Sequence, residues 1–396
     1  MNKIVNQLQQ ILFILLGVTI PTSIAITNLI IGLIGLCWIL EGNFKSKFDI
    51  IKSSKWTFSI FALIGLYALG MLWGEQHLNA AWQFQRLALL LVFPIFLTLD
   101  LKQKTIKNAV KAFLITTFIS AVVAILVNIN IILPPREYIN FISNDWAVSA
   151  FIKYNYHNVL LALAFTMSLY ILLERKTKYP SLLLLFIVAY AISIFTEQGR
   201  AGQVLFNLVS IFYILRYNSN RKHILKGIAL LLLLFLFQFI IYHSTSVYKN
   251  RFDRVSNIIK NNGTIAEEGK KDLRYIFVKE TLDRIIKKPI LGYGTGSFGT
   301  ILKNEVKSGH LFYTHTTPHN QYLYVWFELG ILGLLLLLSI FYHQIRELFK
   351  KKGGWHRILL PLSFMFLMLV DSYFFIFILT VTYIYLFTIY NRYQSE

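Results

Sequence analysis

Long apolar runs recur from one end of this chain to the other, and they decide what it can fold into. A helix needs roughly 20 apolar residues to cross the hydrocarbon core of a bilayer, and about twelve segments approach that length. These segments are residues 8–22, 24–41, 56–73, 84–99, 109–133, 158–173, 180–196, 201–216, 224–242, 321–342, 356–370 and 374–390. Hydrophobic residues occupy 56% of the 396 positions, above the composition of soluble domains. The sequence therefore predicts an all-α polytopic membrane protein with about 12 transmembrane helices.

The first two segments belong to one apolar run that Pro21 interrupts. Because proline disrupts a helix interior, this run predicts either two short spans or one long tilted helix with a re-entrant piece. Lys3 followed by an apolar stretch also resembles a signal peptide, with Ser23-Ile24-Ala25 as its cleavage site. We favour a first span that is not cleaved.

Short basic segments set the orientation of the predicted spans, because lysine and arginine are retained on the cytoplasmic side. These segments are residues 43–55, 100–111, 174–179, 216–226 and 343–357. Residues 243–320 then form one large outer loop, whose own cations do not contradict this because long translocated loops escape the charge rule. The predicted organisation is nine spans in residues 1–242, an outer loop with amphipathic helices in 243–320, and three spans in 321–396.

The formal net charge of +20 has a membrane explanation. Much of it lies in the cytoplasmic segments, where it faces anionic lipid headgroups. We therefore expect membrane lipids, and no nucleic acid, among the partners. Cys37 is the only cysteine and lies within a predicted span, so no disulfide holds the outer loop.

The outer loop carries an amphipathic segment followed by a glycine-rich run. Apolar residues at three- and four-residue spacings from Asp272 to Lys288 predict a helix on the membrane surface, which Pro289 ends. The run GYGTGSFG, residues 292–299, matches a dinucleotide fingerprint only superficially, because that motif needs a preceding strand. It predicts either a tight turn or a nest of backbone amides that can approach a phosphate.

A polar, histidine-rich stretch turns directly into a predicted span at THTTPHNQYLYVWFELGILG, residues 314–333. An ionisable cluster at the mouth of a transmembrane helix is costly, so it indicates chemistry. His319 is the leading candidate, because an imidazole can accept a proton near neutral pH. Glu328 lies deeper and needs a partner, and a buried pair with an arginine is favoured over catalysis. His310, His315 and His319 make only a weak zinc pattern, so no metal is expected.

Three motifs follow one another along residues 190–335, with a long outer loop between the first and the last. They are EQGRAG (197–202), Arg274 ahead of KPILGYG (288–294), and PHNQYL (318–323) before ELG (328–330). Together they resemble the O-antigen ligase and O-antigen polymerase superfamily, which usually has serine where this chain has Gly199. The resemblance implies a fold related to the C-type glycosyltransferases. It also implies metal-independent transfer of a glycan from an undecaprenyl diphosphate carrier at the outer face of the bacterial inner membrane.

The resemblance implies Arg200, Arg274 and His319 as the catalytic residues. Arg200 is expected where a helix begins, so that its guanidinium and the helix N-terminal amides face one anion; a snorkelling interfacial arginine is the alternative. Arg274 supplies a second fork for a diphosphate, although its lysine-rich surroundings are also typical of a solvated face. His319 is expected to assist the acceptor hydroxyl, either as a base or as a polarising group.

Six further residues are assigned to substrate binding. Asn320 and Tyr322 are expected to position His319 or the sugar, and His157 and Asn158 to line the acceptor cleft. Gly292 and Gly294 are expected to bring backbone amides close to the diphosphate.

The predicted function is that of an O-antigen ligase, which transfers a glycan from undecaprenyl diphosphate to a lipid A-core sugar at the periplasmic face, with inversion. An O-antigen polymerase acting on a growing glycan, and a protein O-oligosaccharyltransferase, are alternatives. A flippase or transporter for lipid-linked oligosaccharide is an alternative of another class, although transporters tend to carry charges and broken helices near the midplane. The early outer loops have no adjacent acidic pair and the chain has no P-loop lysine motif, so neither metal nor nucleotide cofactor is expected.

Overall fold

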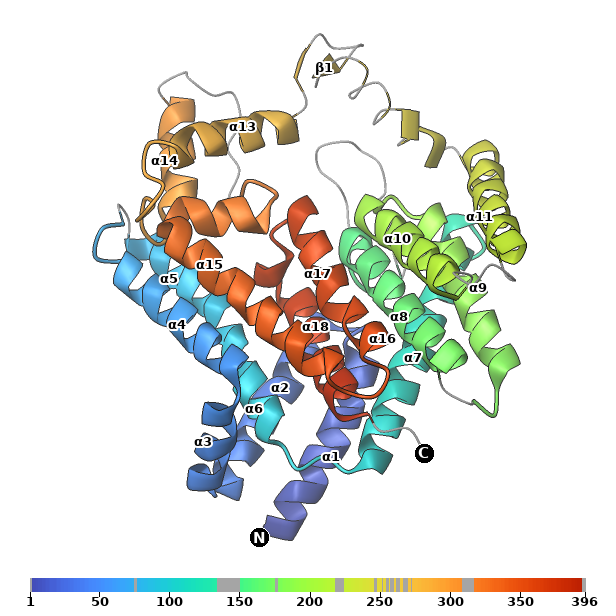
Figure 1. Ribbon diagram of the computed structural model, residues 1–396, viewed down its shortest axis with the longest axis horizontal. Coiled ribbons are helices and arrows are strands. Elements are labelled where there is room, and N and C mark those ends of the chain that lie inside the picture. The colour runs from blue at the N-terminus through green and yellow to red at the C-terminus, as the bar shows by residue number, and fades with distance from the viewer. Residues whose placement is uncertain are drawn as a thin grey trace. The chain divides into compact units, whose positions relative to one another are not determined.

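The computed structural model describes residues 2–74, 77–133, 150–174, 177–217, 224–245, 248–250, 252–253, 256, 260, 264–265, 270–271, 273–307 and 317–393. Within these residues the regular secondary structure is helical apart from one pair of two-residue strands, β1 (Thr264–Ile265) and β2 (Lys270–Lys271). The prediction of an all-α protein is therefore confirmed, and Figure 1 shows the helices in chain order.

Helices account for most of the described chain, and their bounds follow the predicted spans closely. They are α1 (Asn2–Thr19), α2 (Ile24–Glu41), α3 (Phe44–Ser53), α4 (Lys55–Gly70), α5 (His77–Ala88), η1 (Leu89–Leu91), α6 (Val92–Thr98), α7 (Gln103–Asn128), α8 (Tyr154–Glu174), α9 (Pro180–Thr196), α10 (Arg200–Tyr217), α11 (Ile224–Ser244), α13 (Leu273–Ile285), α14 (Ser297–Lys307), α15 (Gln321–Phe349), α16 (Gly354–Arg357), α17 (Leu359–Val370), η3 (Tyr373–Phe375) and α18 (Phe377–Arg392).

Five helices among the described residues are long and apolar enough to cross a membrane: α2, α7, α8, α11 and α15. Several shorter apolar helices accompany them, including α4 and α9. This pattern fits a polytopic membrane protein. The count of about 12 spans and the kinship to C-type glycosyltransferases stay predictions.

Two boundaries refine the sequence analysis. The apolar run around Pro21 is not one continuous helix, because α1 ends at Thr19 and α2 begins at Ile24. A helix is present as α13 where residues 272–288 were predicted to form one, and its place on the membrane surface stays a prediction. A second helix, α14, begins at Ser297 within the glycine-rich run, a segment to which no helix was assigned. Its sequence SFGTILKNEVK is short and mixed, which hides it among loop residues.

The chain packs as two compact units. The first comprises Met1–Phe13, Asn28–Ile106 and Lys271–Gln394. In it α4 lies alongside α15 (Figure 1), and the Trp56 indole N–H donates to Glu347 Oε2 at 2.7 Å, which ties the two helices together. The ring of Tyr383 is fully buried and stacks on Phe364 with centroids 4.5 Å apart, so aromatic packing forms this core.

The second unit comprises Ile14–Thr27, Lys107–Lys270 and Ser395–Glu396. Its centre is α8, which packs against both α9 and α10. Every residue from His157 to Phe165 is buried, so α8 has no solvent or lipid face along this stretch. The rings of Phe165 and Phe206 lie 4.3 Å apart at the α8–α10 contact.

Lys47, in the predicted cytoplasmic segment 43–55, is a buried residue of α3. Lys47 Nζ lies 2.7 Å from Glu41 Oε2 and donates to the Trp38 carbonyl oxygen at 2.7 Å, with its side chain only 5% exposed. Lys45 and Lys52 on the same helix are exposed. Lys47 therefore holds the α2–α3 corner, while its neighbours are available to lipid headgroups.

Candidate functional site

The amino end of α15 is fixed by a side-chain cap. Asn320 is in extended conformation, and its side-chain oxygen accepts the backbone N–H groups of Tyr322 at 3.0 Å and Leu323 at 3.1 Å. Asparagine is among the strongest N-cap residues because it satisfies amides that have no partner within the helix. The sequence thereby fixes where α15 begins, and with it the place of the preceding residue, His319.

His319 forms a pair with Asp371, which follows α17. Its Nδ1 lies 3.1 Å from Asp371 Oδ1, and that oxygen also accepts the Ser372 backbone N–H at 2.7 Å. An ionised carboxylate can only accept a hydrogen bond, so Nδ1 is the donor in this pair. The two side chains are 23% and 18% exposed, so the pair is accessible. An imidazole oriented by a carboxylate is the arrangement of a general base.

The backbone at His319 is held in an uncommon conformation. Its φ is 52°, in the left-handed region, where histidine is tolerated better than most residues. Two side chains tie the start of α15 to α17. Asn320 Nδ2 donates to the Leu369 carbonyl at 3.3 Å, and the Tyr322 hydroxyl donates to the Met365 carbonyl at 2.8 Å. These contacts hold the backbone next to His319, and binding of the sugar by Asn320 or Tyr322 stays a prediction.

Helix α13 approaches the same end of α15. The rings of Phe277 and His319 have centroids 6.4 Å apart, and α13 packs against α15. Position 274 lies three residues before Phe277 in α13, and residues at that spacing share a helix face. The Arg274 backbone therefore lies on the same face of α13 as Phe277, while the Arg274 side chain lies outside the described part of the structure.

The glycine-rich turn after α13 is bonded to a break in α15. Gly330 interrupts that helix with φ 67° and ψ −166°. The Ile331 N–H donates to the Pro289 carbonyl at 2.9 Å, the Tyr293 N–H to Phe327 O at 2.9 Å, and the Gly294 N–H to Glu328 O at 2.8 Å. We call this set of contacts between residues 289–296 and 326–331 the α15 junction. It joins the segment leading from α13 to the helix that His319 precedes.

The α15 junction corrects the idea of a phosphate nest at Gly292 and Gly294. The amides of residues 292 to 295 donate to backbone carbonyls, and the Gly296 amide donates to Glu328 Oε1 at 3.0 Å. Glycine is needed here for close approach, because a Cβ at Gly292 would lie 2.6 Å from the Phe327 carbonyl oxygen. This run is therefore a tight turn, the other of the two predicted alternatives. Gly292 and Gly294 are not assigned to substrate binding.

Glu328 is a buried carboxylate of α15, and its Oε1 accepts a hydrogen bond from the Gly296 backbone N–H at 3.0 Å. Arg86 of α5 acts on the carboxyl electrostatically, as the predicted arginine partner would. The turn also holds Glu328, through the hydrogen bond from Gly296. Glu328 thus belongs to the α15 junction rather than to an ion pair alone.

Arg200 is the first residue of α10, directly after the turn formed by Glu197, Gln198 and Gly199. The glycines on either side let this turn pack on α8. A Cβ at Gly202 would lie 2.1 Å from Asn158 Oδ1, and one at Gly199 would lie 2.5 Å from Asn158 Cβ. A serine at position 199 would therefore meet Asn158.

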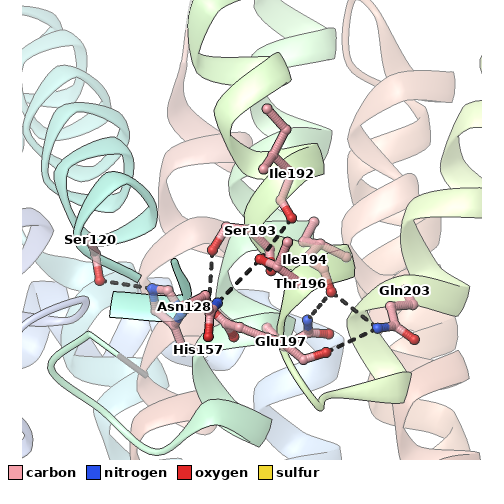
Figure 2. A network of polar contacts seen from close by, with 10 residues as sticks. Ser120, Asn128, His157, Ile192, Ser193, Ile194, Thr196, Glu197 and Gln203 are labelled. Atoms are coloured by element: carbon pink, nitrogen blue, oxygen red, sulfur yellow. Dashed lines mark hydrogen bonds and ion pairs between the residues drawn. The ribbon is translucent and has the colours of Figure 1, made fainter. Parts of the chain in front are cut away.

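A buried polar network holds the same turn (Figure 2). His157 Nδ1 lies 2.6 Å from Glu197 Oε1, and His157 Nε2 lies 2.8 Å from Ser120 Oγ. The Ser193 hydroxyl also donates to Glu197 Oε1, at 3.0 Å. Gln203 Nε2 donates to the carbonyls of Ile194 and Glu197, both at 3.2 Å.

This network corrects the expectation that His157 and Asn158 line an acceptor cleft. Both are fully buried, and Asn158 Nδ2 donates to the Ile194 carbonyl at 2.8 Å. A side chain without exposed surface cannot contact a sugar at an open cleft. Their polar groups instead hold the turn that precedes Arg200.

The three predicted catalytic residues are distributed over both units. His319 and position 274 belong to the first unit and Arg200 to the second, so their meeting in one pocket stays a prediction. His310 and His315 lie outside the described residues, as do residues 311–314 and 316. Among the residues that are described, no group of three histidine, cysteine or acidic side chains could hold a metal ion.

Asp371 is the site residue that sequence reasoning missed. It stands in a short polar turn between two apolar segments, 356–370 and 374–390, which the predicted topology puts on the same side as His319. A lone carboxylate at such a turn is a signal of the kind that drew attention to His319. Its partner lies 52 positions away, so the pairing itself cannot be read from local spacing.

Comparison with known families and proteins adds one match. A family model described as O-Antigen ligase matches residues 182–338, a segment that runs from α9 into α15. It contains Arg200, Arg274, His319 and Glu328, whereas His157 and Asp371 lie outside it. No curated protein sequence matches the chain. The match confirms the resemblance to the O-antigen ligase and polymerase superfamily over that segment.

Proposed function

We propose that this chain, a membrane protein of the O-antigen ligase and polymerase superfamily, transfers a glycan from a polyprenyl diphosphate carrier to an acceptor hydroxyl. The donor is undecaprenyl diphosphate-linked glycan, and the reaction takes place at the periplasmic face of the bacterial inner membrane. The acceptor we favour is a sugar of lipid A core, which makes the protein an O-antigen ligase. The superfamily match supports the reaction class, and the finer assignments are ours.

The His319–Asp371 pair is the observation that carries this proposal. In the reaction a bond forms between the acceptor oxygen and the anomeric carbon, and the bond from that carbon to the diphosphate oxygen breaks. The hydroxyl proton passes to His319 Nε2, because Nδ1 is directed to Asp371 at 3.1 Å. Asp371 then stabilises the imidazolium that forms. Attack opposite the leaving group inverts the anomeric centre.

The diphosphate leaves with its negative charge, so the site has to stabilise that charge. Arg200 is suited to this because it stands at the start of α10. The N-terminal amides of the helix carry a positive partial charge, so they and the guanidinium can face the same anion. Arg274 is proposed as the second cation. Guanidinium forks match diphosphate oxygens in pairs, which makes arginine better suited than lysine. No general acid is needed, because a diphosphate is already a good leaving group.

Two acceptors other than lipid A core fit the same chemistry. A growing glycan on the carrier would make the protein a polymerase, and a protein hydroxyl would make it an O-oligosaccharyltransferase. We favour the ligase because one extended outer loop, residues 243–320, lies between the predicted ninth and tenth spans. The motifs themselves are common to ligases and polymerases.

A flippase or transporter is the candidate from another class. It would need polar groups along a path through the bundle, near the membrane midplane. The His319–Asp371 pair instead lies at a helix end and is partly exposed, which suits a reaction at the membrane surface.

Reconstitution tests the proposal directly. The purified protein in nanodiscs is given an undecaprenyl diphosphate glycan together with lipid A core. A new glycolipid supports the ligase, lengthened carrier-linked glycan supports the polymerase, and movement of the donor between leaflets without any product supports transport. The last result would overturn the proposal.

A further inference from the structure

We propose that Ser120, His157, Ser193 and Glu197 form a buried clamp whose task is to position Arg200 for the donor diphosphate. The inference rests on the proposed function of Arg200 as an anion-binding residue. None of the four touches the reacting atoms in this scheme. They are positioning residues that act through the turn at 197–199.

The clamp is a continuous chain of hydrogen bonds across three helices (Figure 2). It starts at Ser120 in α7, passes through His157 in α8, and ends on Glu197 at the carboxyl end of α9. His157 and Ser120 are 0% exposed and Glu197 is 1% exposed, so water does not compete for these bonds. Hydrogen bonds in such surroundings are strong and directional.

Stability alone does not account for an acid–imidazole pair at this place. Taking two ionisable groups out of water costs free energy that their attraction only partly returns, and apolar residues of similar volume are often as stable. The surrounding second unit is built from apolar helices, for which aliphatic packing would serve. What the pair adds is a defined geometry at the α9–α10 turn.

That geometry reaches Arg200 through the backbone on both sides of the turn. Glu197 caps α9, with its N–H bonded to Ser193 O, and it stands three residues before Arg200. Gln203, in the first turn of α10, donates back to the Glu197 carbonyl. The turn therefore has little freedom, and neither has the backbone of Arg200. Displacing a group that binds substrate by about 1 Å can cost about 10²-fold in rate.

The two oxygens of Glu197 differ, and this difference allows a sharp test. Oε1 accepts from His157 and Ser193, while Oε2 is buried and has no hydrogen-bond partner among the described residues. Glu197→Gln keeps an acceptor for both donors and loses no bond at the other position. It therefore keeps the hydrogen bonds of the clamp, while the carboxylate becomes a neutral amide whose NH2 group stands where Oε2 stood. Glu197→Ala and His157→Ala open the clamp.

The experiment measures the affinity for undecaprenyl diphosphate and the transfer kinetics of the full-length protein in nanodiscs. We expect His157→Ala and Glu197→Ala to weaken diphosphate binding about tenfold or more, and Glu197→Gln to stay within about threefold. Asn128→Ala is the matched control: it removes the 3.2 Å bond to Thr196, beside the turn, without touching Glu197. It should bind like the unaltered protein.

A double-mutant cycle separates positioning from a general loss of structure. If the clamp acts through Arg200, then His157→Ala causes no further loss of affinity in an Arg200→Ala background, because the coupled partner is already gone. Additive losses would overturn the inference, as would normal affinity in both alanine variants. If His157→Ala does not fold, Ser120→Ala takes its place, and affinity equal to that of Asn128→Ala would then count against the clamp. Unchanged binding by Arg200→Ala alone would instead refute the proposed function of Arg200.

Discussion

Replacing Gly330 by alanine tests how the first unit assembles its candidate site. Gly330 breaks α15 with φ 67° and ψ −166°, a region of backbone space that is populated almost only by glycine. An added Cβ would lie 1.9 Å from the Ile290 carbonyl oxygen and 2.7 Å from the Leu291 nitrogen. Both are backbone atoms, so no side chain can rotate away to make room.

The magnitude follows from these contacts. The backbone conformation costs alanine about 1–3 kcal/mol. To reach ordinary van der Waals distance, residues 289–291 would have to move by about 1.5 Å, which breaks the α15 junction. Its three backbone hydrogen bonds, from Ile331, Tyr293 and Gly294, contribute about 0.5–1.5 kcal/mol each. The expected loss is then about 2.5–7.5 kcal/mol, a large share of a typical free energy of unfolding.

Hydrogen exchange of the full-length protein in detergent tests the α15 junction, because it measures the protection of individual backbone amides. The amides of Tyr293 and Gly294 are bonded to α15 carbonyls and should be protected in the unaltered protein. In Gly330→Ala we expect their protection to disappear and glycan transfer to fall with it, because the turn after α13 loses its hydrogen bonds to α15. Gly299→Ala is the control: Gly299 lies inside α14 with nothing within 4 Å of an added Cβ. Alanine should stabilise that helix by about 0.5–1 kcal/mol.

The reasoning fails if Gly330→Ala keeps the protection of residues 293–294 and the turnover of the Gly299→Ala protein. Such a result would mean that the turn and α15 adapt without loss. The α15 junction would then not be what relates α13 to His319.

Three further predictions concern the site and the topology. His319→Ala and Arg200→Ala should each lower transfer by about 10²–10⁴-fold while the protein still inserts into the membrane. His319→Asn is the matched variant, because asparagine tolerates the left-handed backbone at this position. Near-normal turnover in any of these variants would remove the assigned role. Asp371→Asn should lower kcat at least about tenfold with the KM for donor little changed, because the amide no longer fixes the imidazole tautomer; a pure KM effect would argue for binding instead. Reversing Lys45, Lys52 and Lys55 to glutamate should disturb the insertion of the first spans in a cysteine-accessibility assay, whereas Lys47 is left unaltered because it pairs with Glu41; correct insertion would count against the orientation.

The sequence predicts the helices of this protein well, because a bilayer imposes length and hydropathy on each span. Residues 180–196 were predicted as a span and form α9 with the same bounds, since Pro180 and the polar turn at Glu197 mark its ends. The Pro21 run was ambiguous because one proline is compatible with either a kink or a break. The capped start of α15 was within reach of sequence reasoning, as Asn320 precedes the apolar run directly.

Contacts between distant segments lay beyond that reasoning. Asp371 and His319 are 52 positions apart, and Glu197 and His157 are 40 apart, so no periodicity relates them. Gly292 and Gly294 show the same limit, because here a local motif suggested a role that contacts with other segments do not support. Their spacing is that of a phosphate-binding turn, yet the Gly292 amide donates to the Lys288 carbonyl, and the Gly294 amide donates to the Glu328 carbonyl in a helix more than thirty residues further along the chain. Sequence patterns indicate which residues are unusual, and packing decides what they do.

Burial distinguishes the His319–Asp371 pair from the His157–Glu197 pair more clearly than their chemistry does. Both join an imidazole Nδ1 to a carboxylate oxygen, at 3.1 Å for His319 and at 2.6 Å for His157. A base has to reach its substrate, and only the His319–Asp371 pair is partly exposed. At His157 both ring nitrogens already have protein partners, Ser120 and Glu197, so none is left for an incoming hydroxyl. The same pair of groups therefore suits proton transfer in the first unit and the positioning of a backbone turn in the second.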